Sequence, residues 1–158
     1  MAADSYQSGL LDTNILILRK WIDPGELPAA VAISAITLAE LSAGPHEVRP
    51  GSEQKDYEEH AERARRLDIL QRAENEFDPI PFGVEAARAY GQVTAAVIAA
   101  GRKPRRRAVD LMIASVAIAE DLRLFTTNPG DFAGLERLLT VVPVTRPTGI
   151  APHHDRGQ

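Results

Sequence analysis

The chain contains no cysteine among its 158 residues. Disulfide bonds, zinc sites built on thiolates and a cysteine nucleophile are therefore excluded. No glycine-rich loop follows an apolar run, so nucleotide binding of the P-loop or dinucleotide type has no support. The densest basic segment of the chain carries no aromatic residue, and stacking on nucleic-acid bases is not indicated there.

Long apolar runs are also missing. No segment approaches the ~18 apolar residues that would cross a bilayer, and no charged start precedes an apolar stretch at the N-terminus. We therefore expect a soluble, cytoplasmic protein with no membrane partner. The four histidines lie in a Gly-Pro turn, a charged helical stretch and the C-terminal tail, at positions 46, 60, 153 and 154. General acid–base catalysis by histidine is accordingly not favoured.

The length suggests one domain, and 44% hydrophobic residues are typical of a globular chain. The formal net charge is -4, but the charges are unevenly distributed. Residues 102–107, "RKPRRR", hold five of the 18 lysines and arginines. A negatively charged protein with one dense basic segment can still bind a polyanion there. The alternative is that this segment is only a solvated loop.

Apolar runs alternate with helical patterns along the chain. Strands are predicted at 8–12, 30–35, 77–82, 123–127 and 139–144, and helices at 14–20, 37–43, 84–100, 107–120 and 131–138. The stretch 52–76 reads as one helix or a helical hairpin. Prolines in 77–82 predict an edge strand, and Thr13 or Asn14 is the expected cap of the first helix. We expect one domain over residues 1–145 and a disordered tail over 146–158.

This alternation predicts an α/β fold in which a central parallel sheet of four or five strands is flanked by helices on both faces. Ligands of such sheets bind beyond the carboxyl ends of the strands. Asp12 ends the first predicted strand, directly after "GLL", and would lie at that edge. Asp131 follows a later strand through an Asn-Pro-Gly turn. For either aspartate, capping a helix or turn is the structural alternative.

Two further acids lie at the margins of apolar helix faces. In "ISAITLAEL", Glu40 shares a face with Ile36, and in "RRAVDLMIAS" Asp110 shares one with Ile113. Carboxylates are rarely buried unless they are paired or bind a metal. The simpler interpretation of each is a salt bridge, and Arg107, three residues before Asp110, could provide one.

Together the four acids make a stronger argument. A doubly wound sheet could bring them to one edge, where at ~5 Å and an effective dielectric constant of ~20 each ionised pair would repel by roughly 3 kcal/mol. Cations would relieve this repulsion, and oxygen ligands favour Mg²⁺ or Mn²⁺. One or two such ions beside a basic loop describe a phosphodiester hydrolase.

The sequence resembles the PIN-domain ribonucleases, and within them the VapC toxins of toxin–antitoxin pairs. Four segments carry the resemblance in order and spacing, over roughly residues 8–145: "LLDTNILI" (10–17), "ISAITLAEL" (33–41), "RRAVDLMIAS" (106–115) and "LFTTNPGDF" (124–132). The charged stretch 46–75 corresponds to a variable helical arm of the family. The fold that the resemblance implies is the α/β fold predicted above.

The resemblance implies a metal-dependent endoribonuclease whose catalytic and metal-binding acids are Asp12, Glu40, Asp110 and Asp131, with Mg²⁺ or Mn²⁺ as cofactor. Supporting positions that help to hold water or metal correspond to Thr13, Thr127 and Asn128, the last varying between asparagine and aspartate in the family. Contacts with the RNA backbone are predicted for the basic segment, namely Arg102, Lys103, Arg105, Arg106 and Arg107. Arginine suits this role because it binds phosphate through two parallel hydrogen bonds.

The resemblance also implies partners: an RNA substrate, a cognate VapB-type antitoxin that covers the site, and a homodimer that becomes a heterotetramer or larger with antitoxin. Two rival interpretations can be compared with this one on the residues present. A response-regulator-like receiver would need a lysine after a late strand, and no lysine lies beyond Lys103. A degenerate PIN-like module that binds RNA without cutting it would be expected to lack one of the acids, and all four are present.

Overall fold

The computed structural model describes residues 7–49 and 56–149. A parallel sheet of four strands runs in the order β2-β1-β3-β4. The strands are β1 (Ser8–Leu11), β2 (Ala30–Ala32), β3 (Arg123–Thr126) and β4 (Val141–Pro143). The α/β fold with a parallel sheet is therefore confirmed, with four strands within the range predicted.

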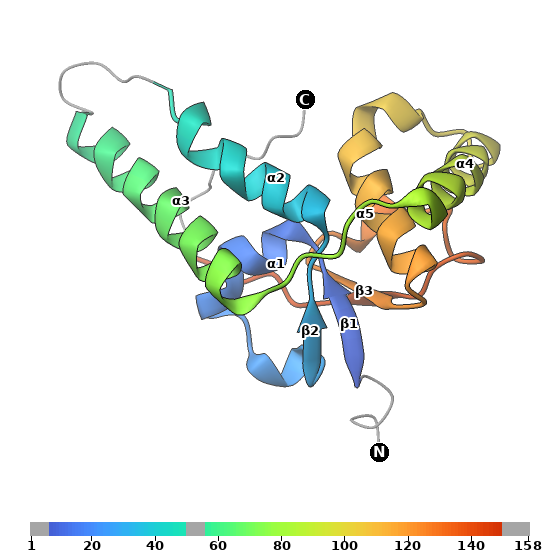
Figure 1. Cartoon of the computed structure of the whole chain (residues 1–158), viewed down its shortest axis with the longest axis horizontal. Coiled ribbons are helices and arrows are strands. Elements are labelled where there is room, and N and C mark those ends of the chain that lie inside the picture. Colours follow the sequence, from blue (N-terminus) through green and yellow to red (C-terminus); the bar gives the residue numbers. More distant parts are fainter. Residues whose placement is uncertain (1–6, 50–55, 150–158) are drawn as a thin grey trace.

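Helices cover both faces of this sheet (Figure 1). The structure contains α1 (Thr13–Leu18), α2 (Ala35–Ala43), α3 (Asp56–Glu76), α4 (Val84–Ala99) and α5 (Ala108–Ala119). Short 3-10 helices include η4 (Gly44–Glu47), η6 (Pro104–Arg107) and η7 (Pro129–Phe132). The described part of 52–76 forms one helix, so the hairpin alternative is wrong for it. Residues 52–55 and 150–158, which belong to the predicted helix and tail, lie outside the described residues.

Successive residues of the central strands point to opposite faces, which explains their continuous apolar sequence. Leu10 and Leu124 pack with α4 and α5, whereas Leu11 and Phe125 pack with α1 and α3. All four side chains are essentially buried, at 0–1% exposure. The sheet thus separates two apolar cores, and burying both fixes the register of β1 against β3.

Two sequence predictions differ from the structure. Residues 77–82 do not form a strand: Ile80 makes a single parallel bridge to Ser34, accepting from Ala35 N at 2.7 Å and donating to the carbonyl of Ile33 at 2.9 Å. The edge location was right, but Pro79 and Pro81, on either side of Ile80, have no N–H to donate and so prevent a longer ladder. The cap of α1 is Asp12, not Thr13 or Asn14, because the Asp12 carboxylate accepts from Thr13 N.

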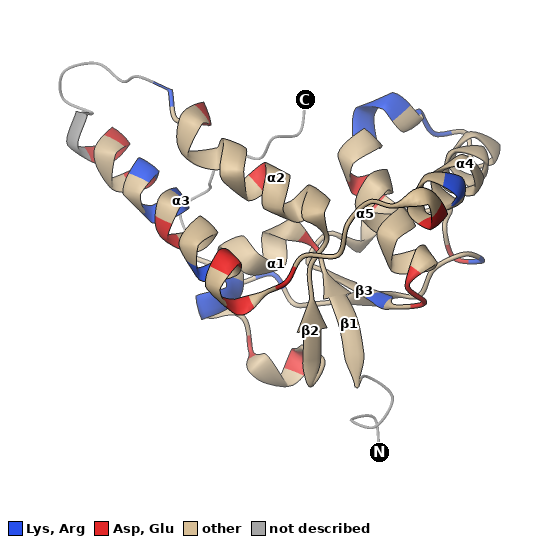
Figure 2. Ribbon diagram, viewed as in Figure 1, with Lys and Arg blue, Asp and Glu red and all other residues tan. Residues whose placement is uncertain are grey.

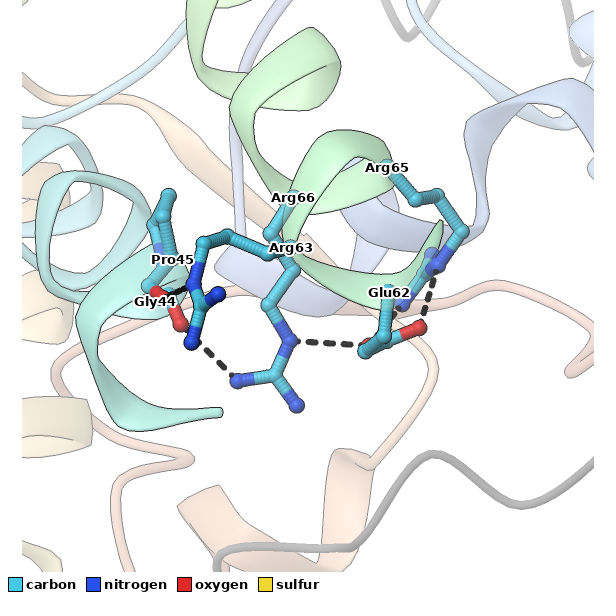
Figure 3. A network of polar contacts seen from close by, with 6 residues as sticks. All are labelled: Gly44, Pro45, Glu62, Arg63, Arg65 and Arg66. Atoms are coloured by element: carbon cyan, nitrogen blue, oxygen red, sulfur yellow. Dashed lines mark hydrogen bonds and ion pairs between the residues drawn. The ribbon is translucent and has the colours of Figure 1, made fainter. Parts of the chain in front are cut away.

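The arm formed by α2, η4 and α3 projects from the sheet (Figure 1). Arg66 donates to the carbonyl of Gly44 at 2.9 Å and Arg63 to that of Pro45 at 3.3 Å, so α3 satisfies acceptors just beyond the end of α2 (Figure 3). Glu62 accepts from Arg65 and Arg66, and hydrogen bonding to Arg65 is the main cause that lowers its pKa to about 2. The charged face of α3 is therefore largely an internal ion-pair network.

Gly9 is needed where the chain crosses Phe125. A Cβ atom on Gly9 would lie 2.3 Å from the Phe125 ring, which is buried. We expect Gly9→Ala to lower the free energy of unfolding by about 2 kcal/mol, because the packed ring must shift. Urea unfolding of Gly9→Ala in wild-type and Phe125→Leu backgrounds measures this, and the cost should shrink when the ring is absent.

Gly91→Ala is the matched control for this substitution. Gly91 lies on the exposed face of α4, where an added Cβ atom meets nothing within 4 Å. There the same change should stabilise the protein by roughly 0.5–1 kcal/mol, because alanine favours the helix. An equal cost of Gly9→Ala in both Phe125 backgrounds would contradict the clash.

Candidate functional site

Asp12 lies where β1 leaves the core, beside the switch point between the two halves of the sheet. Its side chain is only 4% exposed. One carboxylate oxygen, Oδ1, accepts from Thr13 N at 2.9 Å, and the other, Oδ2, accepts from the Thr126 hydroxyl at 2.8 Å. Thr126 is itself fixed, since its hydroxyl accepts from Asn128 N at 3.0 Å. Among the described residues, these two donors hold the carboxylate in place.

The pKa of Asp12 is raised from 3.8 to about 6, mainly because burial disfavours the charged form. The hydrogen bonds from Thr126 and Thr13 lower the pKa, whereas the negative charges of Glu40 and Asp131 raise it. Three of the four predicted acids therefore interact electrostatically at this edge of the sheet. A buried carboxylate with carboxylate neighbours is a typical functional arrangement, because extra positive charge is needed to stabilise it.

Glu40 reaches this edge from α2, near the middle of the helix. The Thr13 hydroxyl donates to Glu40 Oε1 at 2.5 Å and lies 3.0 Å from the hydroxyl of Thr37. Thr37, fully buried in the first half of α2, also receives support from Ser34, the N-cap of that helix. Thr13 therefore links the end of β1 to α2 and orients Glu40 toward the site, as a supporting residue would.

Asp131 and Asp110 come from the other half of the chain. Asp131 lies in η7 and forms an ion pair with Arg107, the last residue of η6. Asp110 lies half-buried in the first turn of α5. The structure thus assigns Arg107 to Asp131, where the sequence suggested Asp110 as its partner. The reason is that the tight Asn-Pro-Gly turn brings Asp131 back toward the start of α5.

Within residues 7–49 and 56–149, no three Asp, Glu or His side chains converge closely enough to hold one ion as they stand. The acids are instead held by protein groups: Thr126 and Thr13 on Asp12, Thr13 on Glu40, and Arg107 on Asp131. The donor set is nevertheless chemically suited to Mg²⁺ or Mn²⁺, since it offers carboxylate oxygens around a destabilised charge. Side-chain rotations would be required to bring these oxygens together.

Thr127 offers a further polar group at this edge. Its hydroxyl is buried and has no hydrogen-bond partner in the part of the chain that the structure describes. Such a group costs about 1–3 kcal/mol, and a bound water would satisfy it. The sequence identified Thr127 but missed Thr126 and Thr37, which make the direct contacts. The adjacent threonines of "FTTN" were the available signal for Thr126.

This orphan hydroxyl gives a prediction. Thr127→Val should leave the free energy of unfolding of the metal-free protein unchanged or slightly higher, because no hydrogen bond is lost. Thr126→Val should cost about 1–3 kcal/mol, because the Asp12 carboxylate loses a donor. Chemical unfolding in the presence of a chelator compares the two variants. Equal destabilisation would mean that Thr127 has a partner in the metal-free protein.

The basic segment borders the same edge, and Figure 2 shows its lysine and arginines gathered on the turn before α5. Arg102 donates to the carbonyls of Gly130 and Ala133, each at 3.0 Å, and so fixes the turn that carries Asp131. Asn128 accepts from Arg146 at 3.2 Å through its side-chain oxygen. RNA contact by residues 102–107 stays a prediction, although their position beside the acids agrees with it.

The PIN-domain family model matches residues 10–138. The chain belongs to the PIN-domain family. A crystal structure of VapBC-5, a member of the VapBC family of toxin–antitoxin systems from Mycobacterium tuberculosis, is 30% identical with a TM-score of 0.69, and the match covers 85% of this PIN-domain chain and 95% of that chain. The predicted resemblance to VapC toxins is confirmed by this neighbour.

Other similar structures agree. VapBC2 from Rickettsia felis, bound to a DNA fragment from its promoter, is 27% identical with a TM-score of 0.59, and the match covers 87% of this chain and 98% of that one. DNA-bound VapBC from Salmonella typhimurium, 22% identical with a TM-score of 0.56 over 85% and 96% of the two chains, shares the PIN fold. No curated protein sequence matches the chain significantly. No helix in the described part of this PIN domain is both long and apolar enough to traverse a bilayer.

Proposed function

We propose that this PIN-domain chain is the toxin of a toxin–antitoxin pair and hydrolyses RNA phosphodiester bonds with Mg²⁺ or Mn²⁺. The observation that carries the proposal is the buried Asp12 carboxylate, whose raised pKa reflects burial and the neighbouring charges of Glu40 and Asp131. At neutral pH the ionised carboxylates repel one another, and a bound cation would relieve this repulsion. The similarity to VapBC proteins supports the toxin role.

In this proposal Asp12, Glu40, Asp110 and Asp131 hold the metal. A divalent cation bound there would lower the pKa of a water and stabilise the leaving oxygen of the phosphodiester. The chain's other groups orient these ligands: Thr126 fixes Asp12, and Thr13 fixes Glu40. Lys103, Arg105 and Arg106 would attract the RNA backbone to the carboxyl edge of the sheet, in the cytoplasm where RNA is available.

The partners are part of the same proposal. An antitoxin of the VapB type would cover the acidic edge, because its arginine could replace the cation among the carboxylates. A homodimer, joined to antitoxin in a heterotetramer or larger, is the proposed assembly. The proposed subunit surface is α4, which exposes Val84 and Ile98 near its two ends, at 66% and 60%. Sedimentation of Val84→Lys/Ile98→Lys tests whether that surface joins the subunits.

The deciding experiment is cleavage of a structured RNA pool by the purified, antitoxin-free protein. Discrete cuts should appear with Mg²⁺ or Mn²⁺ and disappear with EDTA. Cleavage that persists in EDTA would overturn the metal-dependent mechanism. RNA binding without any cleavage, under conditions where Mn²⁺ binds, would favour a non-catalytic RNA-binding PIN-like module.

A further inference from the structure

A cavity of about 220 Å³ lies between the basic segment and the acidic edge. Its floor is apolar, formed by Val97 and Leu111, and its walls carry Lys103, Arg106 and Arg107 beside Asp131. Arg102 also borders the cavity but is committed to two backbone carbonyls. Several cations line this small cavity, and the one carboxylate beside it does not balance them. The cavity is therefore suited to a further anion.

The cations of this cavity differ in whether they form ion pairs. Among the residues that the structure describes, Lys103 and Arg106 form no ion pair, whereas Arg107 is paired with Asp131. The side chain of Arg107 is 38% exposed and that of Asp131 31% exposed. An ion pair with this much exposure is weak, at about 0–1 kcal/mol. It can therefore be exchanged for a better partner at little cost.

We propose that the cavity is a subsite for a phosphate of nucleic acid and that Arg107 moves between this phosphate and Asp131. With the cavity empty, Arg107 neutralises Asp131 and keeps it from a cation. When a phosphate enters, Arg107 and its free neighbours bind that anion. The negative charge of Asp131 is then no longer compensated by a guanidinium, so the acidic edge attracts a divalent cation. This inference rests on the proposed function and adds an order to it: RNA strengthens metal binding.

The geometry gives Arg107 this role rather than its neighbours. A guanidinium carries five N–H donors in a planar fork, and one carboxylate uses at most two of them. Arg107 also ends η6 and immediately precedes α5, the helix that carries Asp110. Its side chain thus connects the basic segment to Asp131 at the acidic edge. Arg105 belongs to the same turn but is not among the residues that line the cavity.

The test measures Mn²⁺ binding by the EPR signal of free Mn²⁺, with full-length wild type, Arg107→Gln and the matched control Arg88→Gln, which changes an exposed arginine on α4 that does not line the cavity. Without RNA, Arg107→Gln should bind Mn²⁺ about two- to fivefold more tightly, because an exposed ion pair no longer competes for Asp131. A 2′-O-methyl RNA oligonucleotide, which is not cleaved, should tighten Mn²⁺ binding to wild type by a similar factor. This coupling should vanish in Arg107→Gln and persist in Arg88→Gln.

Further measurements identify the ligand and distinguish a specific effect from misfolding of a variant. Inorganic phosphate in place of the oligonucleotide shows whether a free anion suffices, and Lys103→Gln/Arg106→Gln should weaken oligonucleotide binding without tightening Mn²⁺ binding. Arg107→Lys, which keeps the charge but loses the fork, should lie between wild type and Arg107→Gln. Unchanged Mn²⁺ affinity in folded Arg107→Gln, or no effect of the oligonucleotide on wild type, would overturn the inference. Wild-type RNA cleavage alongside either result would leave the proposed nuclease function standing.

Discussion

Asp12→Asn is expected to stabilise the metal-free protein at pH 7.5 by about 2 kcal/mol. The folded-state pKa of about 6, against 3.8 ordinarily, means that ionised Asp12 opposes folding by about 3 kcal/mol at this pH. Asparagine has no charge to bury. It loses the hydrogen bond donated by Thr126, at a cost of about 1 kcal/mol. Urea unfolding in the presence of EDTA measures the difference.

The pH dependence of wild type carries the same signature. Between about pH 4 and pH 6 the folded protein binds more protons at Asp12 than the unfolded chain does, so stability falls as pH rises through this window. Glu62 has the opposite sign: its lowered pKa contributes stability above about pH 4.5 that is lost as pH falls toward 2. The difference between wild type and Asp12→Asn isolates Asp12, and it should grow by about 3 kcal/mol across the window.

Metal provides the control for this prediction. Saturating Mg²⁺ should stabilise wild type at pH 7.5, because a ligand that binds only the folded state shifts unfolding by mass action. Asp12→Asn should gain much less. Parallel pH profiles for wild type and variant without metal would show that Asp12 is not under electrostatic strain, and the argument from its burial would fail.

The sheet and its layers could be predicted from the sequence because apolar segments of strand length alternated with helical patterns. Leu10-Leu11 and Leu124-Phe125 are buried on both faces, and such doubly buried strands read as continuous apolar runs. Residues 77–82 failed because local composition cannot distinguish one bridge from a strand. Their extended conformation depends on the backbone groups of residues 33–35, which tertiary packing supplies.

Some features of the candidate site could likewise be predicted from the sequence, and others could not. Asp12 and Asp131 could be placed together because each comes shortly after a strand that ends at one edge, and Glu40 joins them from the helix that follows another strand. The pairing of Arg107 with Asp131 could not be predicted, since Asp110 is the nearer acid in sequence. It depends on the tight turn at η7, which Arg102 fixes by hydrogen bonds to two carbonyls. Local spacing contains no information about that contact.

Asp110→Asn is expected to lower kcat for RNA cleavage at least about a hundredfold. Changing groups that merely support metal ligands typically costs 10–100-fold in metal affinity or activity, so loss of a ligand's charge should cost at least roughly as much. Stability should change little and in the opposite direction from Asp12→Asn. Asp110 lies in the first turn of α5, where a negative charge favours the helix by about 0.3–1 kcal/mol.

Asp121→Asn is the matched control, because it makes the same chemical change just beyond the other end of α5. Asp121 is exposed and has a positive φ of 53°, a conformation that asparagine also adopts readily. Cleavage by Asp121→Asn should equal that of wild type. If Asp12→Asn and Asp110→Asn both lose cleavage while their free energies of unfolding change in opposite directions, catalysis is separated from folding. Full cleavage by Asp110→Asn would remove Asp110 from the site and leave the other three acids to hold the metal.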